Sequence, residues 1–490
     1  MNLVYHIFTK LKTWSQDPFN RIFILILLFG ILLRFYQLEG FVTFLGDQGR
    51  DAIILKRIVT FEHFPAIGAP SSVGQVFLGP FYYYFIAPWL FFSGFNPIGP
   101  AIGVAFFSSI FLVIAYVAIT ELFNKKVALV SVFLLAFSEV LINFSRFSWN
   151  PNLLPLASFL LFYVLVKGLK DHDVKKFVIS GALFSISIQL HYVSLALTMP
   201  IVLVLIHYLY VNRKRTSKNL IPIFAMGVSF FILSLPLLVF DLRHSFLNSK
   251  NFITLFTDSK SIAGSGFQEI FNTFTALNVF AFRQNFHAFF SLLLLILLIL
   301  SMIFTWKQKR QLSLLILFFL IGLLITSFYT GRKIPHYFGA LYSYYYIIIA
   351  YFVTQIFWNK KLGIFLVMFL IGFIFMNIQG YSFLFNHPNN QIQKAQEVAR
   401  LIDQNISINR YQVTSLPHQY SDSTYRYFLE IWKKRPIEKD SLEKAEELFV
   451  VCEDECTPIG DPQWDIAYFA PREIIGTWDV ANVKLYKLIR

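Results

Sequence analysis

The residues best suited to chemistry lie in a short polar stretch, residues 43–51, directly after a long apolar segment. This stretch places Asp47, Arg50 and Asp51 within five residues. If residues 46–52 begin a helix, the four-residue spacing puts both carboxylates on one face, and the helix N-terminus favours the first carboxylate. One carboxylate could then take a proton from a hydroxyl group, or both could hold a divalent cation. The alternative is a helix cap at Asp47 and a surface ion pair between Asp51 and Arg50 or Lys56.

Positive charges follow in the same stretch, at Arg50, Lys56 and Arg57. If this loop lies on the outer side of a membrane, they indicate an anionic partner, for which a lipid phosphate is the natural candidate. Ordinary pairing with Asp47, Asp51 and Glu62 remains the alternative.

A second group of candidates lies between two apolar segments. Arg146 could bind phosphate with two hydrogen bonds, Trp149 could stack on a sugar, and Asn150 could bond to hydroxyl groups. An interfacial tryptophan, a snorkelling arginine and an Asn-Pro turn would explain the same residues structurally. His191 is isolated in an apolar stretch of nearly forty residues, where it could bind substrate or only bond between helices.

The remaining substrate-binding candidates are basic residues in two later loops and one tyrosine of a run of three: Arg243, His244, Arg332, Lys333, His336 and Tyr83. Two such cationic groups facing Asp47 would suit a diphosphate or phosphodiester leaving group. Ion-paired loop ends are the alternative for each loop.

Composition identifies the setting of these residues. The 490-residue chain is 56% hydrophobic and only 14% charged, with a mean hydropathy of +0.58. Apolar runs of about 18–24 residues, the length of a membrane-spanning helix, recur up to residue 384. The chain is therefore predicted to be an all-α polytopic membrane protein. Its net charge of +14 comes largely from short loops that set topology, so nucleic acid is not an expected partner.

We predict about eleven spans, at residues 22–38, 99–121, 127–144, 152–168, 176–192, 194–211, 220–240, 287–306, 311–329, 336–357 and 362–384. Residues 81–95 are predicted to be interfacial or re-entrant, because the basic loops 125–126, 167–176, 212–218, 307–310 and 360–361 then share a side with the basic N-terminus. The positive-inside rule makes that side cytoplasmic. The first outer loop (39–80), the outer loop 241–286 and the candidate residues then lie outside the cytoplasm, in a plasma membrane.

After residue 386 the sequence becomes polar, which divides the chain into a membrane module, 1–386, and a C-terminal domain, 387–490. Helical periodicity at 391–404 and 423–434 and strand patterns at 411–416, 447–452, 464–469 and 480–489 predict a small extracytoplasmic α/β domain. Cys452 and Cys456 could form a disulfide there, or remain two free thiols.

These features resemble the GT-C membrane glycosyltransferases. The resemblance rests on the Gly46-Asp47-Gln48-Gly49-Arg50-Asp51 loop after the first span, on residues 79–85 and on residues 145–151. The nearest relatives would be bacterial members of the dolichyl-phosphate-mannose–protein mannosyltransferase family, such as aminoarabinose transferases.

The resemblance implies sugar transfer from a polyprenyl-phosphate donor, at the outer face of the membrane, to a hydroxyl of a lipid, glycan or protein. It implies inversion at the anomeric carbon, with Asp47 as the general base and Asp51 as a secondary candidate. Many relatives carry an acid where this chain has Asn150; Glu139 is the nearest replacement. No cofactor is expected unless Asp47 and Asp51 hold a divalent cation. An outer-face oligosaccharide ligase or polymerase and a lipid-linked-sugar transporter are the alternatives.

Overall fold

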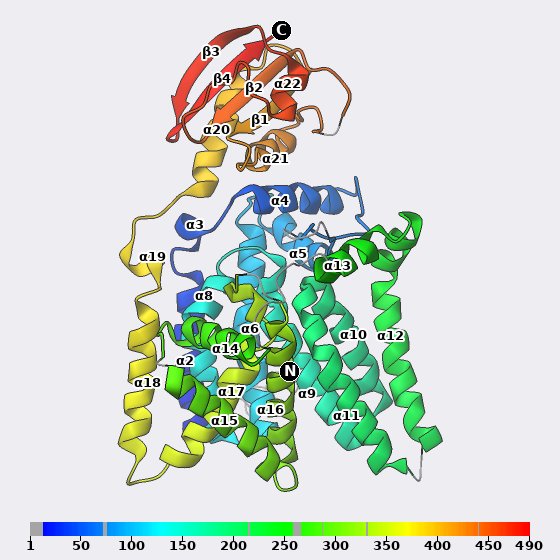
Figure 1. Cartoon of the computed structure of the whole chain (residues 1–490). Helices are drawn as coiled ribbons and strands as arrows, with labels where there is room; N and C mark the ends of the chain where they lie inside the picture. Colours follow the sequence, from blue (N-terminus) through cyan, green and yellow to red (C-terminus); the bar gives the residue numbers. More distant parts are fainter. Residues whose placement is uncertain are drawn as a thin grey trace, which may run out of the picture.

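A bundle of long helices carries a small mixed domain at one end (Figure 1). The computed structural model describes residues 13–71, 76–213, 216–257, 266–286, 288–329, 332–439 and 441–490. Part of the predicted basic N-terminal lead-in (1–12) and part of the basic loop 212–218 lie outside the described residues.

The chain enters the bundle at α2 (Pro18–Phe35), where Asp17 Oδ1 accepts a hydrogen bond from the backbone N–H of Phe19 (2.8 Å) and Pro18 occupies the first helical position. The short α3 (Leu38–Phe41) follows. Next, α4 (Gly46–Val59) lies across the end of the bundle, beneath the C-terminal domain (Figure 1). The predicted helix at residues 46–52 is thus the first half of α4.

The next helix, α5 (Phe81–Phe92), stays at this end of the bundle. Near its start, the Tyr83 hydroxyl donates to Asp51 of α4 (2.9 Å), and just beyond its end the Phe95 carbonyl accepts from Tyr427 of the C-terminal domain (2.6 Å). This twelve-residue helix therefore contacts α4 near its start and the C-terminal domain just beyond its end; that residues 81–95 are interfacial or re-entrant stays a prediction.

The remaining helices form the bundle and its connections. They are α6 (Gly99–Leu122), α7 (Lys125–Phe137), α8 (Glu139–Ser145), α9 (Leu154–Asp171), α10 (Val174–Leu190), α11 (Thr198–Val211), α12 (Thr216–Arg243), α13 (Leu247–Thr257), α14 (Gly266–Phe282), α15 (Ala288–Thr305), α16 (Arg310–Ser327), α17 (Tyr342–Phe357), α18 (Gly363–Ile378) and α19 (Ser382–Phe385), with short 3-10 helices η1 (Asn150–Leu153), η2 (Tyr192–Leu197) and η4 (Pro335–Phe338). In the described part of the predicted outer loop 241–286 lie two helices, α13 and α14.

One predicted span is broken. Residues 127–144 form α7 and α8, which meet at an angle of 62°. Within the described residues, seven helices are long and apolar enough to span a membrane, or eight if this bent pair counts as one span. The multi-pass architecture is therefore clear, while the total of about eleven spans stays a prediction.

Several basic loops gather at the end of the bundle opposite the C-terminal domain (Figure 1). Lys125 pairs with Asp17 (2.5 Å), and the Lys126 ammonium lies 5.7 Å from the ring centre of Trp358, beside the loop 360–361. Lys309 lies similarly over Tyr351 (5.3 Å). These contacts bring the 125–126, 307–310 and 360–361 loops together, as the predicted topology requires; that this end is cytoplasmic stays a prediction.

The C-terminal domain contains α20 (Gln391–Asn405), β1 (Tyr411–Leu416), α21 (Ser423–Ile431), β2 (Glu447–Cys452), α22 (Trp464–Phe469), β3 (Glu473–Val480) and β4 (Val483–Ile489). The sheet order is β1-β2-β4-β3, with β1 and β2 parallel and the other pairs antiparallel. A disulfide joins Cys452 to Cys456 at the end of β2.

Two sequence predictions in this domain were wrong. Residues 464–469 form α22 instead of a strand, because Ile466 and Phe469 pack together into the core at helical spacing and the buried Asp465 accepts a hydrogen bond from Thr414 (2.8 Å). Residues 480–489 are not one strand, since a turn with positive φ at Ala481 and Asn482 separates β3 from β4.

Candidate active site

The first turns of α4 hold Asp47, Arg50 and Asp51. The guanidinium of Arg50 lies between the two acids, 2.8 Å from Asp47 Oδ1 and 2.8 Å from Asp51 Oδ1. The carboxylates differ in environment, because the Asp47 side chain is 52% exposed and that of Asp51 only 1%. Arg50 thus links an open carboxylate to a buried one.

Asp51 is fixed from two sides. Its Oδ1 accepts hydrogen bonds from Arg50 and from the Tyr83 hydroxyl (2.9 Å), while its Oδ2 has no partner among the described residues. Burial raises the pKa of the Asp51 carboxyl, and the charge of Arg50 opposes that rise. Asp51 is therefore placed to orient Arg50, and through it Asp47.

Asp47 and Arg50 line a cavity of about 780 Å³ between α4 and the C-terminal domain. The membrane module also contributes Phe147 and Trp149, and Gln48 ties this loop to α4 by donating to the Ser148 carbonyl (3.3 Å). Of the predicted site residues, Asp47, Arg50 and Trp149 therefore meet at one cavity.

A second cluster lies behind Trp149. The His336 ring centre is 4.6 Å from that of Trp149 and 5.2 Å from that of His191. Burial lowers the pKa of His336 to about 4, so the imidazole is neutral near pH 7. Asn150 is buried, and neither polar atom of its amide has a partner among the described residues. The structure thus brings Trp149, His191 and His336 together from three separate segments.

Lys56 and Arg57 point to a different partner from the predicted lipid phosphate. Arg57 makes two hydrogen bonds to Glu430 of α21 (2.7 and 2.9 Å) and one to Glu438 (2.7 Å), and Lys56 lies 3.3 Å from Glu430 and 2.5 Å from Glu62. These two cations fasten α4 to the C-terminal domain, and Lys56 also makes the pairing with Glu62 that was the alternative in the sequence. Binding of a lipid phosphate by Lys56 or Arg57 stays a prediction.

Arg146 is likewise occupied. Its guanidinium donates to the carbonyls of Leu33 (2.9 Å) and Tyr36 (2.9 Å) at the end of α2, and it lies 3.8 Å from the ring centre of Phe383. A cation at a helix C-terminus neutralises the unpaired carbonyls there. Arg146 therefore caps α2, and the sequence prediction of phosphate binding is not supported by this geometry.

The other basic candidates lie apart from the cavity. The His244 ring stacks on Phe240 (4.1 Å), and Lys333 donates to the Thr326 carbonyl (3.0 Å). The side chains of Arg243 and Arg332 are exposed. None of these four is among the described residues that line the cavity.

The far wall of the cavity comes from the C-terminal domain and was not predicted from the sequence. This wall includes Lys394, Tyr420, Tyr425 and Glu453. More than 300 residues separate these side chains from Asp47, and no sequence pattern links them to it.

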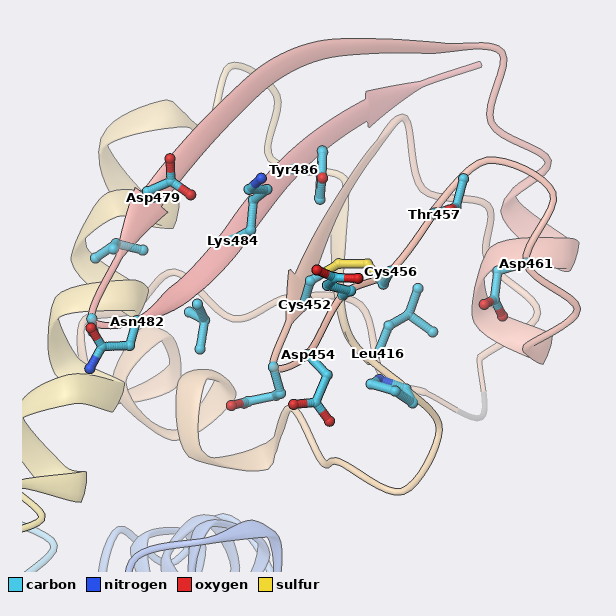
Figure 2. Close-up of a pocket in the computed structure, with 16 residues that line it drawn as sticks. Leu416, Cys452, Asp454, Cys456, Thr457, Asp461, Asp479, Asn482, Lys484 and Tyr486 are labelled. Carbon is cyan, nitrogen blue, oxygen red and sulfur yellow. A yellow bond between two sulfur atoms is a disulfide. The ribbon is translucent and has the colours of Figure 1, made fainter.

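A larger groove of about 1,240 Å³ adjoins this wall, at the end of the sheet where β1 and β2 finish and the β3–β4 turn lies (Figure 2). Glu453, Ala481 and Val483 line both the groove and the cavity. The two hollows are therefore neighbours across Glu453.

The chain is similar to known proteins in sequence over one segment and in fold over nearly its whole length. Residues 78–240 match the family model described as dolichyl-phosphate-mannose-protein mannosyltransferase. A search of curated proteins found no match. The fold is similar to that of ArnT from Cupriavidus metallidurans bound to undecaprenyl phosphate, with a TM-score of 0.61 and 12% identity over 95% of this chain and 97% of that one. The apo form of the same protein gives a TM-score of 0.58 and 12% identity over 98% of each chain.

An oligosaccharyltransferase from Archaeoglobus fulgidus, tethered to an acceptor peptide, is also similar. Its TM-score is 0.50, with 13% identity over 87% of this chain and 65% of that chain.

Proposed function

The family match and the shared fold support a membrane glycosyltransferase of the GT-C superfamily, and from that premise we propose that this chain transfers a sugar from a polyprenyl-phosphate donor to an acceptor hydroxyl at the outer face of the membrane. The observation that carries the proposal is the Asp47–Arg50–Asp51 group at the cavity between α4 and the C-terminal domain. The binding of undecaprenyl phosphate by the structurally similar ArnT supports the donor class.

Asp47 is the proposed general base. It is the more open of the two carboxylates and lies at the cavity, whereas Asp51 is buried and bonded to Tyr83. In the reaction, the acceptor oxygen bonds to the anomeric carbon, the bond from that carbon to the phosphate oxygen breaks, and the hydroxyl proton passes to Asp47. Attack from the face opposite the leaving phosphate inverts the anomeric carbon.

Arg50 has two proposed tasks. It holds Asp47 in position through an ion pair anchored on buried Asp51, and it contributes positive charge to the cavity in which the lipid phosphate departs. Because its guanidinium already lies between the two carboxylates, we propose that this pair does not bind a divalent cation. Turnover that persists in excess EDTA would support this part of the mechanism; loss of turnover that Mg²⁺ or Mn²⁺ restores would refute it.

The test is transfer by the purified full chain in nanodiscs, with a panel of radiolabelled undecaprenyl-phosphate sugars as donors. We expect Asp47→Asn to lower turnover by at least about 100-fold, the usual contribution of a general base. Glu121→Gln is a matched control, since it also replaces a carboxylate by the isosteric amide, and Glu121 is a partly exposed carboxylate that pairs with Lys167 away from the cavity. Equal turnover by Asp47→Asn and the wild type would remove Asp47 as the base. If no donor gives turnover, and the protein in sealed proteoliposomes moves labelled lipid-linked sugar from one leaflet to the other, the chain is a transporter and not a transferase.

A further inference from the structure

The wall of the cavity that faces α4 is built by the C-terminal domain, and its chemistry differs from that of the membrane side. Lys394 comes from α20, Tyr420 precedes α21, Tyr425 lies in α21, and Glu453 directly follows β2. Because α4 lies between the bundle and this domain (Figure 1), this wall is on the side of the cavity that is farther from the bundle. A lipid-linked donor must approach the cavity from the bundle. An acceptor that contacts this wall therefore approaches from the side of the C-terminal domain.

Glu453 is held in a fixed orientation on this wall. The Tyr425 hydroxyl donates a hydrogen bond to Glu453 Oε1, and Tyr425 is only 5% exposed. Burial raises the pKa of the Tyr425 hydroxyl, which therefore remains a donor. Glu453 itself is partly exposed and lines the cavity. The result is an oriented carboxylate that can accept hydrogen bonds from a bound molecule.

Aromatic surfaces complete the cavity. Tyr420 is 38% exposed on the domain side, while Phe147 and Trp149 stack on each other on the membrane side, with ring centres 6.0 Å apart. The amide side chains of Gln391 and Gln419 also line the space. A pyranose ring has an apolar C–H face that packs on aromatic rings and hydroxyl groups that donate to carboxylates and amides. The cavity therefore combines the two kinds of contact that a carbohydrate needs.

On the basis of the proposed transferase function, we propose that the C-terminal domain forms the acceptor subsite, which binds a carbohydrate through Glu453 as oriented by Tyr425. The acceptor hydroxyl then lies in the same cavity as Asp47, on the side away from the lipid donor. Glu453 is a specificity-determining residue in this scheme, and Tyr425 is a positioning residue that acts through it.

The neighbouring groove gives this acceptor room to extend. It shares Glu453, Ala481 and Val483 with the cavity, and further carboxylates such as Asp454 and Asp479 line it (Figure 2). Its volume of about 1,240 Å³ exceeds that of the cavity. An oligosaccharide whose terminal sugar lies beside Asp47 can therefore continue along the groove, and longer glycans should bind more tightly than single sugars.

The experiment is saturation-transfer NMR with the full chain in nanodiscs and no donor. The probes are methyl α-mannoside, mannotriose, cellotriose and chitotriose, with a Ser/Thr-containing peptide as the other class of acceptor. We expect at least one trisaccharide to bind, more tightly than the single sugar. Glu453→Gln should weaken that binding about tenfold or more through loss of a charge-assisted hydrogen bond, and Tyr425→Phe should weaken it less. Glu443→Gln, an exposed carboxylate of the same domain, is the matched control.

Three results would overturn the subsite: no glycan binds to the wild type, Glu453→Gln and the wild type bind glycan equally, or only the peptide binds and depends on Glu453. Matching thermal unfolding of the variants and the wild type excludes misfolding, and Glu453→Asp should restore part of the binding. This assay needs no turnover, so it separates the two proposals. In the transfer assay, Glu453→Gln should raise the KM for the acceptor while acceptor-independent hydrolysis of the donor continues, whereas Asp47→Asn should lower both reactions.

Discussion

The contact between Glu430 and α4 gives a sharp prediction about how the two parts of the protein are held together. The Glu430 side chain is 4% exposed and binds Arg57, which is 22% exposed, and Lys56, which is 13% exposed. Glu430→Gln removes the shared negative charge but keeps the shape of the side chain. Breaking a buried ion pair costs about 3–5 kcal/mol. Here Arg57 keeps Glu438 and Lys56 keeps Glu62, so we expect a loss of about 2 kcal/mol.

A loss of about 2 kcal/mol corresponds to an opening of the domain contact that is roughly 30-fold more frequent. Hydrogen exchange followed by mass spectrometry would measure it, as faster exchange of backbone amides in α4 and α21 with unchanged exchange in α6 and α9. Glu443→Gln is again the control, because Glu443 is about half exposed and lies 3.3 Å from Arg410 within the domain. If Glu430→Gln exchanges like this control, the ion pairs do not hold the domain, and other contacts, such as the hydrogen bond from Tyr427 to the Phe95 carbonyl, must do so.

Three further predictions follow from other contacts. Gly49→Ala should separate α4 from α21 and lower turnover, because a Cβ at Gly49 would lie 2.5 Å from the backbone nitrogen of Thr424; hydrogen exchange and transfer assays would test it, and wild-type behaviour would refute it. Arg146→Met should lower the apparent Tm while leaving the KM for the donor unchanged, since Arg146 caps α2; a raised KM with an unchanged Tm would instead restore the phosphate-binding prediction. The third concerns pH. The folded-state pKa of His336 lies at about 4, below its ordinary value of 6.5, so its contribution to stability is complete above pH 6.5 and is lost as pH falls toward 4. This loss amounts to at most about 3.4 kcal/mol. His336→Phe should flatten part of the Tm against pH curve over that range, and the neighbouring His191, whose pKa is lowered as well, accounts for the rest.

Much of the membrane architecture follows from local sequence. Apolar segments of spanning length must bury their backbone polar groups in helices, so composition alone predicts a helical membrane module. The positions of the basic loops predict that α5 does not cross the membrane. If α5 crossed it, every later basic loop would lie on the side opposite the basic N-terminus. Where the prediction failed, at α22 and at the α7–α8 break, long-range contacts are present. Thr414 donates a hydrogen bond to Asp465 of α22, and the backbone N–H of Glu139, the first residue of α8, donates to Asn377 Oδ1 (2.8 Å).

The sequence by itself determined which residues could do chemistry at the opening of α4, since Asp47, Arg50 and Asp51 lie within one helical turn or so of each other. It could not determine their roles. Asp51 is buried against Tyr83 and anchors Arg50, whereas Asp47 stays exposed. Lys56 and Arg57, which were candidates for binding an anionic ligand, pair with Glu430 of the C-terminal domain. Both outcomes depend on side chains distant in sequence, as does the cavity wall around Glu453. Charge and spacing are local properties, whereas exposure and partner choice are set only when the C-terminal domain packs onto α4.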